Sequence, residues 1–262
     1  MRGHVPRAVP TFIAAVAAVL AAVAPIATAS AAAPGGLSIN PALLERVART
    51  GPVGAVTVRN TTSSSMRVTV RARPWRQPRS GVVAPDTRRT LARQLRVSPA
   101  TFTLPAGQRR TVSVRLLRTP PRYSLYGSLE VIGTPPAARR AIRPRYRLIA
   151  GVRLNPPAAR RVLRVRSGQV RSNGRRTVVA LRNAGNTVMP VTGSVRIVGG
   201  TGTVRTTIAP ARILPGATVD VNLRSGRLLG GRYRATITLR QGGRAIVSTR
   251  RSFTVPRAPT RR

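Results

Sequence analysis

Few side chains in this sequence could carry out acid–base, nucleophilic or metal chemistry. Its 262 residues include four acids (Glu45, Asp86, Glu130 and Asp220), one histidine (His4) and no cysteine. All 47 basic residues are arginine, so no lysine is present for a Schiff base or a phosphate loop. Catalysis near neutral pH needs groups that titrate there, and zinc sites need His, Cys or carboxylate ligands. The composition therefore predicts that the protein is not an enzyme and holds no metal or other cofactor.

The excess of arginine over acids is the main physical signal in the composition. The formal charge is +43 at pH 7, while 42% of the residues are apolar, which is enough to build a folded core. Such a charge predicts a surface that attracts polyanions. Glu130 and Asp220 fall in predicted strands far apart in the sequence. We expect each of these two acids to neutralise nearby arginines.

The N-terminus has the three parts of a secretory signal peptide. Arg2 and Arg7 precede an apolar run at residues 12–24, and small residues follow it. This run of 13 residues is shorter than the roughly 20 that span a bilayer, so a signal peptide is favoured over a membrane anchor. We expect residues 1–29 to be removed, with cleavage after Ala29 or Ala31. The mature chain is then exported to the periplasm or the extracellular cell surface and has no membrane span.

The rest of the chain predicts an all-β protein with two tandem immunoglobulin-like β-sandwich domains. Short runs of Val, Ile, Leu and Thr are broken by Gly, Pro, Asn and Ser. Apolar residues alternate with Arg or Thr, so one face of each strand should enter a core. Residues 42–49 are the best helical candidate. Strands are expected at 53–60, 66–73, 91–97, 111–118, 125–132, 146–154, 162–170, 175–182, 188–198, 203–208, 217–223, 231–239 and 244–255.

The domain boundaries follow from a stiff linker and a repeated order of motifs. Pro156 and Pro157 cannot lie inside a strand, which separates a first domain at 37–156 from a second at 162–256, with a basic tail at 257–262. In each half an asparagine, Asn60 or Asn183, ends a strand and begins a polar turn. A Leu-Pro turn containing glycine follows in each half, and the first half carries an extra loop at 74–90.

These features resemble a known family. The signal peptide, residues 37–41 (LSINP), the strand at 56–60 and residues 97–107 (VSPATFTLPAG) resemble the N-terminal domain of periplasmic pilus-assembly (PapD-like) chaperones. The same order is similar to the peptidoglycan-binding domain of wall surface proteins that interact with WxL proteins. The resemblance implies two sandwiches and a non-catalytic, chaperone-like role in assembling surface or pilus proteins.

The resemblance also implies a partner-binding strand, because such chaperones pair one of their edges with an incomplete subunit. The corresponding strand here is 145–154. One face of it either enters the partner or packs inside the first domain. In that family a pair of basic residues binds the terminal carboxylate of the subunit. The first strand of this sequence, at 37–41, has no arginine to contribute to such a pair. Arg145 or Arg147 would substitute for one member of the pair. The implied partner-binding residues are Arg145, Tyr146, Arg147, Leu148, Ile149, Ala150, Val152 and Leu154.

Two kinds of partner remain open. The first is a protein subunit of the cell envelope. The alternative is an anionic wall polymer, in which case this protein is a cell-wall or anionic-polymer-binding surface protein. Nucleic acid is disfavoured, because aromatic residues make up 3% of the chain and the protein is expected to leave the cytoplasm. Arginine also alternates with core residues, which favours charge spread over the outer faces of two sandwiches.

Overall fold

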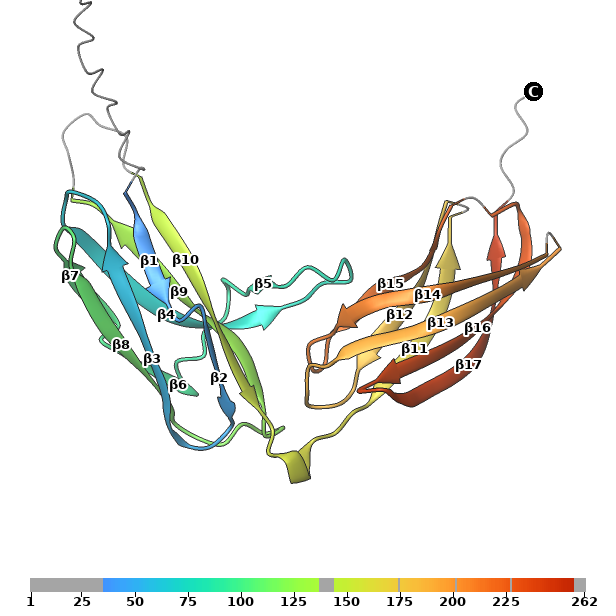
Figure 1. Cartoon of the computed structure of the whole chain (residues 1–262), viewed down its shortest axis with the longest axis horizontal. Coiled ribbons are helices and arrows are strands. Elements are labelled where there is room, and N and C mark those ends of the chain that lie inside the picture. Colours follow the sequence, from blue (N-terminus) through green and yellow to red (C-terminus); the bar gives the residue numbers. More distant parts are fainter. Residues whose placement is uncertain (1–34, 137–143, 174, 201, 227, 257–262) are drawn as a thin grey trace, which may run out of the picture. The chain divides into compact units, whose positions relative to one another are not determined.

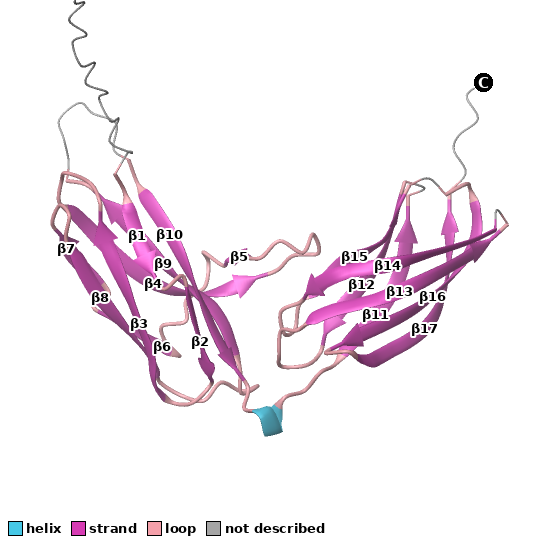
Figure 2. Ribbon diagram, in the orientation of Figure 1, coloured by secondary structure: helices cyan, strands magenta, loops and turns pink. Residues whose placement is uncertain are grey.

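The computed structural model describes residues 35–136, 144–173, 175–200, 202–226 and 228–256, and these residues form two β-sandwiches (Figure 1). Strands make up most of the described chain (Figure 2). Each sandwich has its own hydrophobic core. The prediction of an all-β protein with two sandwiches is therefore confirmed. The predicted signal peptide at 1–29 and the basic tail at 257–262 lie outside the described residues.

The first sandwich consists of two sheets that enclose its core. One sheet has the order β1-β3-β8-β6, and the other has the order β2-β10-β9-β4-β5, with β7 paired to β4. The bounds are β1 (Leu37–Asn40), β2 (Leu43–Val47), β3 (Gly51–Asn60), β4 (Met66–Arg76), β5 (Ala84–Pro85), β6 (Leu95–Ser98), β7 (Thr101–Leu104), β8 (Arg109–Leu116), β9 (Leu125–Thr134) and β10 (Tyr146–Asn155).

The second sandwich follows a short 3-10 helix, η1 (Ala158–Arg160). Its sheets have the orders β11-β12-β15 and β14-β13-β16-β17. The bounds are β11 (Val165–Ser172), β12 (Arg176–Asn183), β13 (Pro190–Gly199), β14 (Gly202–Arg212), β15 (Thr218–Ser225), β16 (Gly231–Gln241) and β17 (Arg244–Val255).

The period-two pattern of the sequence decides which side of each strand is buried. In β4, Val68, Val70 and Ala72 enter the core, whereas Arg67 and Arg71 are exposed. Burying the apolar side chains contributes roughly 25 cal/mol for each Å² removed from water. The arginines between them stay hydrated, so the strand is amphipathic and needs no charge inside the core. β16 repeats this alternation of buried and exposed residues.

The best helical candidate, residues 42–49, forms no helix, because residues 43–47 are strand β2. Leu44 and Ala48 are buried in the first core, and the backbone pairs in parallel with the second half of β10. A helix of two turns is marginal by itself, whereas β2 gains a ladder of hydrogen bonds and an apolar contact. The strand expected at 91–97 is also shorter, because Leu91 begins a turn and β6 starts only at Leu95.

A buried asparagine joins two turns in each sandwich. The Asn60 side-chain Nδ2 donates to the carbonyl oxygens of Ser64 at 2.8 Å and Leu104 at 3.0 Å. Asn60 is fully buried. Asn183 binds two equivalent turns in the second sandwich. The prediction that each asparagine begins a turn is confirmed. The repeated order of motifs also has a physical cause, because each asparagine side chain bonds both to the turn that follows it and to the later Leu-Pro turn.

Candidate functional site: the open edge of strand β10

Half of β10 lies at the edge of its sheet. Strand β9 pairs with β10 from Tyr146 to Leu154. On the opposite side β2 pairs only with Gly151–Asn155. Within the described ranges no strand pairs with residues 146–150 on that side, because β1 belongs to the other sheet. The N-terminal half of β10 therefore presents an edge that could accept another strand.

The direction of the backbone groups on this edge follows from one hydrogen bond. The Gly151 amide donates to the Ala42 carbonyl at 2.7 Å, on the β2 side. Along a strand the backbone groups of every second residue face the same neighbour. The amide and carbonyl groups of Ile149 and Arg147 therefore face the open side. These are the groups that would pair with an added strand.

The side chains of β10 divide between the core and the outer surface. Ala150, Val152 and Leu154 are buried in the first core, and Tyr146 and Leu148 are half-buried against it. From the sequence, this face of β10 could either enter a partner or pack inside the first domain. Its last three side chains, Ala150, Val152 and Leu154, pack inside the first sandwich. On the outer face, 38% of Ile149 is exposed.

Glu130, in β9, is a buried carboxylate beside this edge. Its Oε1 accepts a hydrogen bond from Arg147 Nε at 2.8 Å, and its Oε2 accepts one from Arg73 Nε at 3.0 Å. Burial acts to raise the pKa of the Glu130 carboxyl, but the hydrogen bonds from Arg147 and Arg73 outweigh it and lower the pKa below its usual value. Arg73 also donates to the carbonyls of Thr87 and Arg89. Glu130 thus links β9 to β10 and β4, and Arg73 links them to the loop after β5.

The ion pairs decide which of the predicted partner-binding arginines, Arg145 or Arg147, is available to bind a partner. Arg147 is bound to Glu130, while Arg145 is exposed. Asp220 pairs with Arg79 at 3.1 Å and with Arg171 at 2.7 Å. The prediction that Glu130 and Asp220 neutralise nearby arginines is therefore confirmed.

An exposed polar cluster lies beside the contact between β2 and β10. Glu45 Oε2 lies 3.2 Å from Arg153 Nη1, and its Oε1 accepts a hydrogen bond from Asn155 at 2.7 Å. Because exposed ion pairs stabilise little, we expect Glu45→Gln to lower the free energy of unfolding in urea by less than about 1 kcal/mol. Leu44→Ala removes a buried side chain, so it should cost about 2 kcal/mol or more. A larger loss for Glu45→Gln would mean that charge, and not burial, holds β2.

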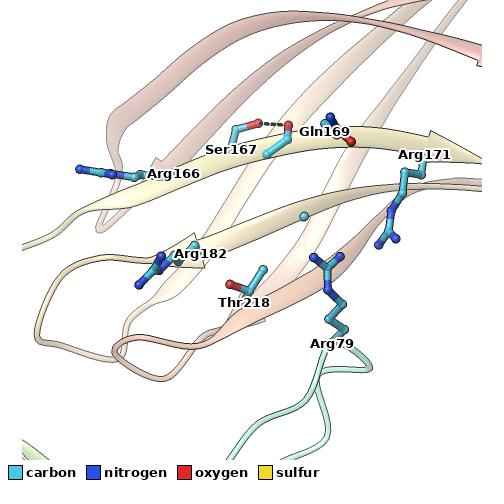
Figure 3. A pocket seen from close by; sticks show the side chains of 9 residues that line it. Arg79, Arg166, Ser167, Gln169, Arg171, Arg182 and Thr218 are labelled. Atoms are coloured by element: carbon cyan, nitrogen blue, oxygen red, sulfur yellow. Dashed lines mark hydrogen bonds between the residues drawn. The ribbon is translucent and has the colours of Figure 1, made fainter.

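A basic hollow lies on the outer face of the sheet β11-β12-β15. Its volume is about 370 Å³, and its lining includes Arg79, Arg166, Arg171 and Arg182 (Figure 3). Arg79 comes from the loop between β4 and β5 and not from the strands that carry the other three (Figure 3). Asp220 already binds two of these arginines, so the hollow is partly neutralised. Sequence reasoning missed it, because arginine is common along the whole chain.

The site combines backbone groups at the edge of β10 with guanidinium groups beside it. No three His, Cys, Asp or Glu side chains gather as metal ligands in the described ranges. No helix of the described chain is long and apolar enough to cross a membrane.

The fold defines a class of protein with two β-sandwich domains, like those of chaperone–usher chaperones. The sequence matches no protein-family model and no curated protein. Among solved structures, the fold is similar to that of many fimbrial, PapD-like chaperones. One is a chain from a chaperone–tip adhesin complex of CFA/I fimbriae biogenesis, with 13% identity, a TM-score of 0.52 and coverage of 85% of this chain and 100% of that one. Another is the class 5 fimbriae chaperone CfaA, with 14% identity, a TM-score of 0.51 and coverage of 86% and 100%.

A third similar structure is the E. coli chaperone DraB, with 15% identity, a TM-score of 0.46 and coverage of 84% of this chain and 98% of that one. At identities this low, the similarity establishes the fold and not the function.

Proposed function

We propose that this protein is an exported, non-catalytic binding protein that assists the assembly of surface or pilus proteins by pairing β10 with a subunit. The observation that carries this proposal is the open edge at residues 146–150, where β2 stops short of the end of β10. The similar structures are fimbrial chaperones, and one of them is a complex with a tip adhesin. This supports an envelope protein subunit as the partner.

The open edge offers both a backbone ladder and apolar contacts. The backbone groups of Arg147 and Ile149 would pair with an incoming strand, as in other complexes formed by strand addition. Tyr146 and Leu148 remain half-exposed on one face, and Ile149 is exposed on the other. Arg145 is the available guanidinium for a terminal carboxylate, since Arg147 is bound to Glu130. Ala150, Val152 and Leu154 would support the edge from the core.

The proposal includes the domain organisation and the location of the protein. Residues 37–156 form the subunit-binding domain and 162–256 the second domain. Residues 1–29 act as the signal peptide, and the mature protein works in the periplasm or at the cell surface. Mass spectrometry of the mature N-terminus from the native host tests the export, which predicts a start at Ser30 or Ala32.

The edge can be tested without disturbing the core. The protein is used to capture subunits from the envelope fraction of its host, and the affinity of the identified subunit is then measured. Ile149→Pro removes an amide that faces the open side, so it should spare the β9 ladder. Ile149→Arg places a charge in the contact. We expect each change to weaken subunit binding at least ~10-fold, about 1.4 kcal/mol.

Leu117→Arg is the matched control, because it adds the same charge in the same sandwich at a side chain that is 41% exposed, against 38% for Ile149. It should bind like the unaltered protein. Circular dichroism verifies that all three variants fold. If the captured subunit binds all three variants equally well, β10 is not the binding edge.

A further inference from the structure

A contiguous cluster of arginines covers the outer face of the sheet β14-β13-β16-β17. Residues paired directly across neighbouring strands project on the same face of a sheet. One row across the four strands reads Arg205, Arg196, Thr236 and Arg250. The next row reads Thr203, Val198, Arg234 and Ser252, and beyond it Arg232 pairs with Thr254. All five arginines are exposed. We call Arg196, Arg205, Arg232, Arg234 and Arg250 the C-terminal arginine face.

The spacing of these arginines is close enough for one ligand to touch several. Arg234 is the diagonal neighbour of both Arg196 and Arg250. Diagonal neighbours lie about 7–8 Å apart at the backbone, within reach of long side chains. Arg232 precedes Arg234 by two residues on the same strand, roughly 7 Å away. Guanidinium groups this close repel one another, and a bound anion relieves that repulsion.

No carboxylate of the described residues lies on this face. The four acids of the chain are Glu45, Asp86, Glu130 and Asp220, and only Asp220 belongs to the second sandwich. Asp220 is in β15, in the other sheet, where it binds Arg79 and Arg171. The basic hollow of Figure 3 therefore has an internal counter-ion, whereas the C-terminal arginine face has none from its own sheet.

The other side chains of this face indicate what kind of anion it could bind. The face contains a depression of about 850 Å³ whose lining includes four of the arginines together with Thr236, Ser252 and Thr254. Hydroxyl donors between guanidinium groups suit a tetrahedral phosphate, which accepts from several directions at once. Tyr233 and Phe253, the aromatic residues of these strands, are buried and stack on each other in the core. Both also line the depression, but they are only 6% and 7% exposed, so neither offers an open ring face on which nucleic-acid bases could stack.

We propose that the C-terminal arginine face binds a linear polymer of repeating phosphate groups that carries no bases. The inference goes beyond the proposed subunit binding and uses the other sandwich. A flexible chain of phosphates can contact Arg232, Arg234 and the row of Arg196 and Arg250 in turn. It releases counterions as it binds, so the affinity falls steeply with salt. Such a site would hold the protein on a phosphate-bearing envelope polymer.

Long-chain inorganic polyphosphate is the probe for this site. Its affinity for the full-length protein is measured at an ionic strength of about 0.15 M. The face variant replaces Arg196, Arg232, Arg234 and Arg250 by Gln. We expect it to bind polyphosphate at least ~10-fold more weakly, with a shallower dependence on salt. Arg234→Gln alone should weaken binding by about 3-fold, and it keeps the test valid if the fourfold variant does not fold.

The matched control variant replaces Arg59, Arg96, Arg109 and Arg115 by Gln. These arginines are also exposed on one face of a sheet, in the first sandwich. They form two cross-strand pairs, Arg59 with Arg109 and Arg96 with Arg115. The two pairs are roughly 20 Å apart along β8. The control removes the same charge without a contiguous cluster, so it should lose less than about 3-fold.

Three results would overturn the proposal. Equal losses in the two fourfold variants would mean that net charge alone attracts the polymer. Tighter binding to polyglutamate of matched length would assign the face to carboxylates. Tighter binding to a single-stranded oligonucleotide or to phosphatidylglycerol vesicles would assign it to nucleic acid or to a membrane. Subunit binding through β10 is measured separately, so either proposal can fail while the other stands.

Discussion

Replacing Glu130 by Gln is expected to lower the free energy of unfolding by about 3 kcal/mol at neutral pH, because it breaks a buried ion pair from one side. Glu130 is 3% exposed and binds two guanidinium groups, and the arginine on the β4 side, Arg73, is itself largely buried. The amide of Gln keeps the volume but removes the charge that both arginines need. Urea denaturation at low ionic strength measures the loss.

The same carboxylate makes stability depend on pH. The folded pKa of Glu130 is lowered by its arginine partners, so its contribution is complete above the unfolded pKa, about 4.3. The contribution disappears as pH falls through the folded pKa, where the carboxyl group takes up a proton in both states. The difference between the unaltered protein and Glu130→Gln should therefore be constant from pH 7 to about pH 5 and shrink at lower pH.

Asp86→Asn is the control for this prediction. Asp86 lies 3.8 Å from Arg89, whose side chain is 81% exposed, so the pair is screened by water. We expect Asp86→Asn to cost less than about 1 kcal/mol. If the two variants lose the same stability, or if the loss in Glu130→Gln is the same at all pH values, the buried carboxylate is not a stabilising centre.

The sequence predicted the features that depend on neighbours along the chain. Alternation in β4 gave the correct buried face, and Asn60 and Asn183 marked equivalent turns in the two sandwiches. Both signals arise within a few residues, where side-chain period and turn chemistry act directly.

The features that the sequence did not predict depend on partners far along the chain. Residues 43–47 were not among the expected strands, because the strand that pairs with β2, β10, lies about a hundred residues later. The surroundings of Glu130 depend on which residues of β4 and β10 lie across from β9. The C-terminal arginine face depends on register too, since a slip of one residue would turn these side chains inward.

The two buried asparagines should each be worth about as much as the ion pairs of Glu130. Asn183 Nδ2 donates to the carbonyls of Thr187 at 2.9 Å and Ile213 at 2.7 Å, and Asn183 is 2% exposed. Asn183→Ala would leave two buried carbonyls unpaired, each at a cost of roughly 1–3 kcal/mol. We expect a loss of about 3 kcal/mol in the free energy of unfolding, and a similar loss for Asn60→Ala.

The location of each loss is measurable, because the only tryptophan, Trp75, lies in β4 of the first sandwich. Since each sandwich has its own core, Asn60→Ala should shift the urea transition seen by Trp75 fluorescence more than Asn183→Ala does. Far-UV circular dichroism should register both changes. Asn173→Ala is the control, because Asn173 also caps a turn but is exposed, so it should cost less than about 1 kcal/mol. Losses as small as this control at positions 60 and 183 would contradict the idea that these asparagines hold the turns together.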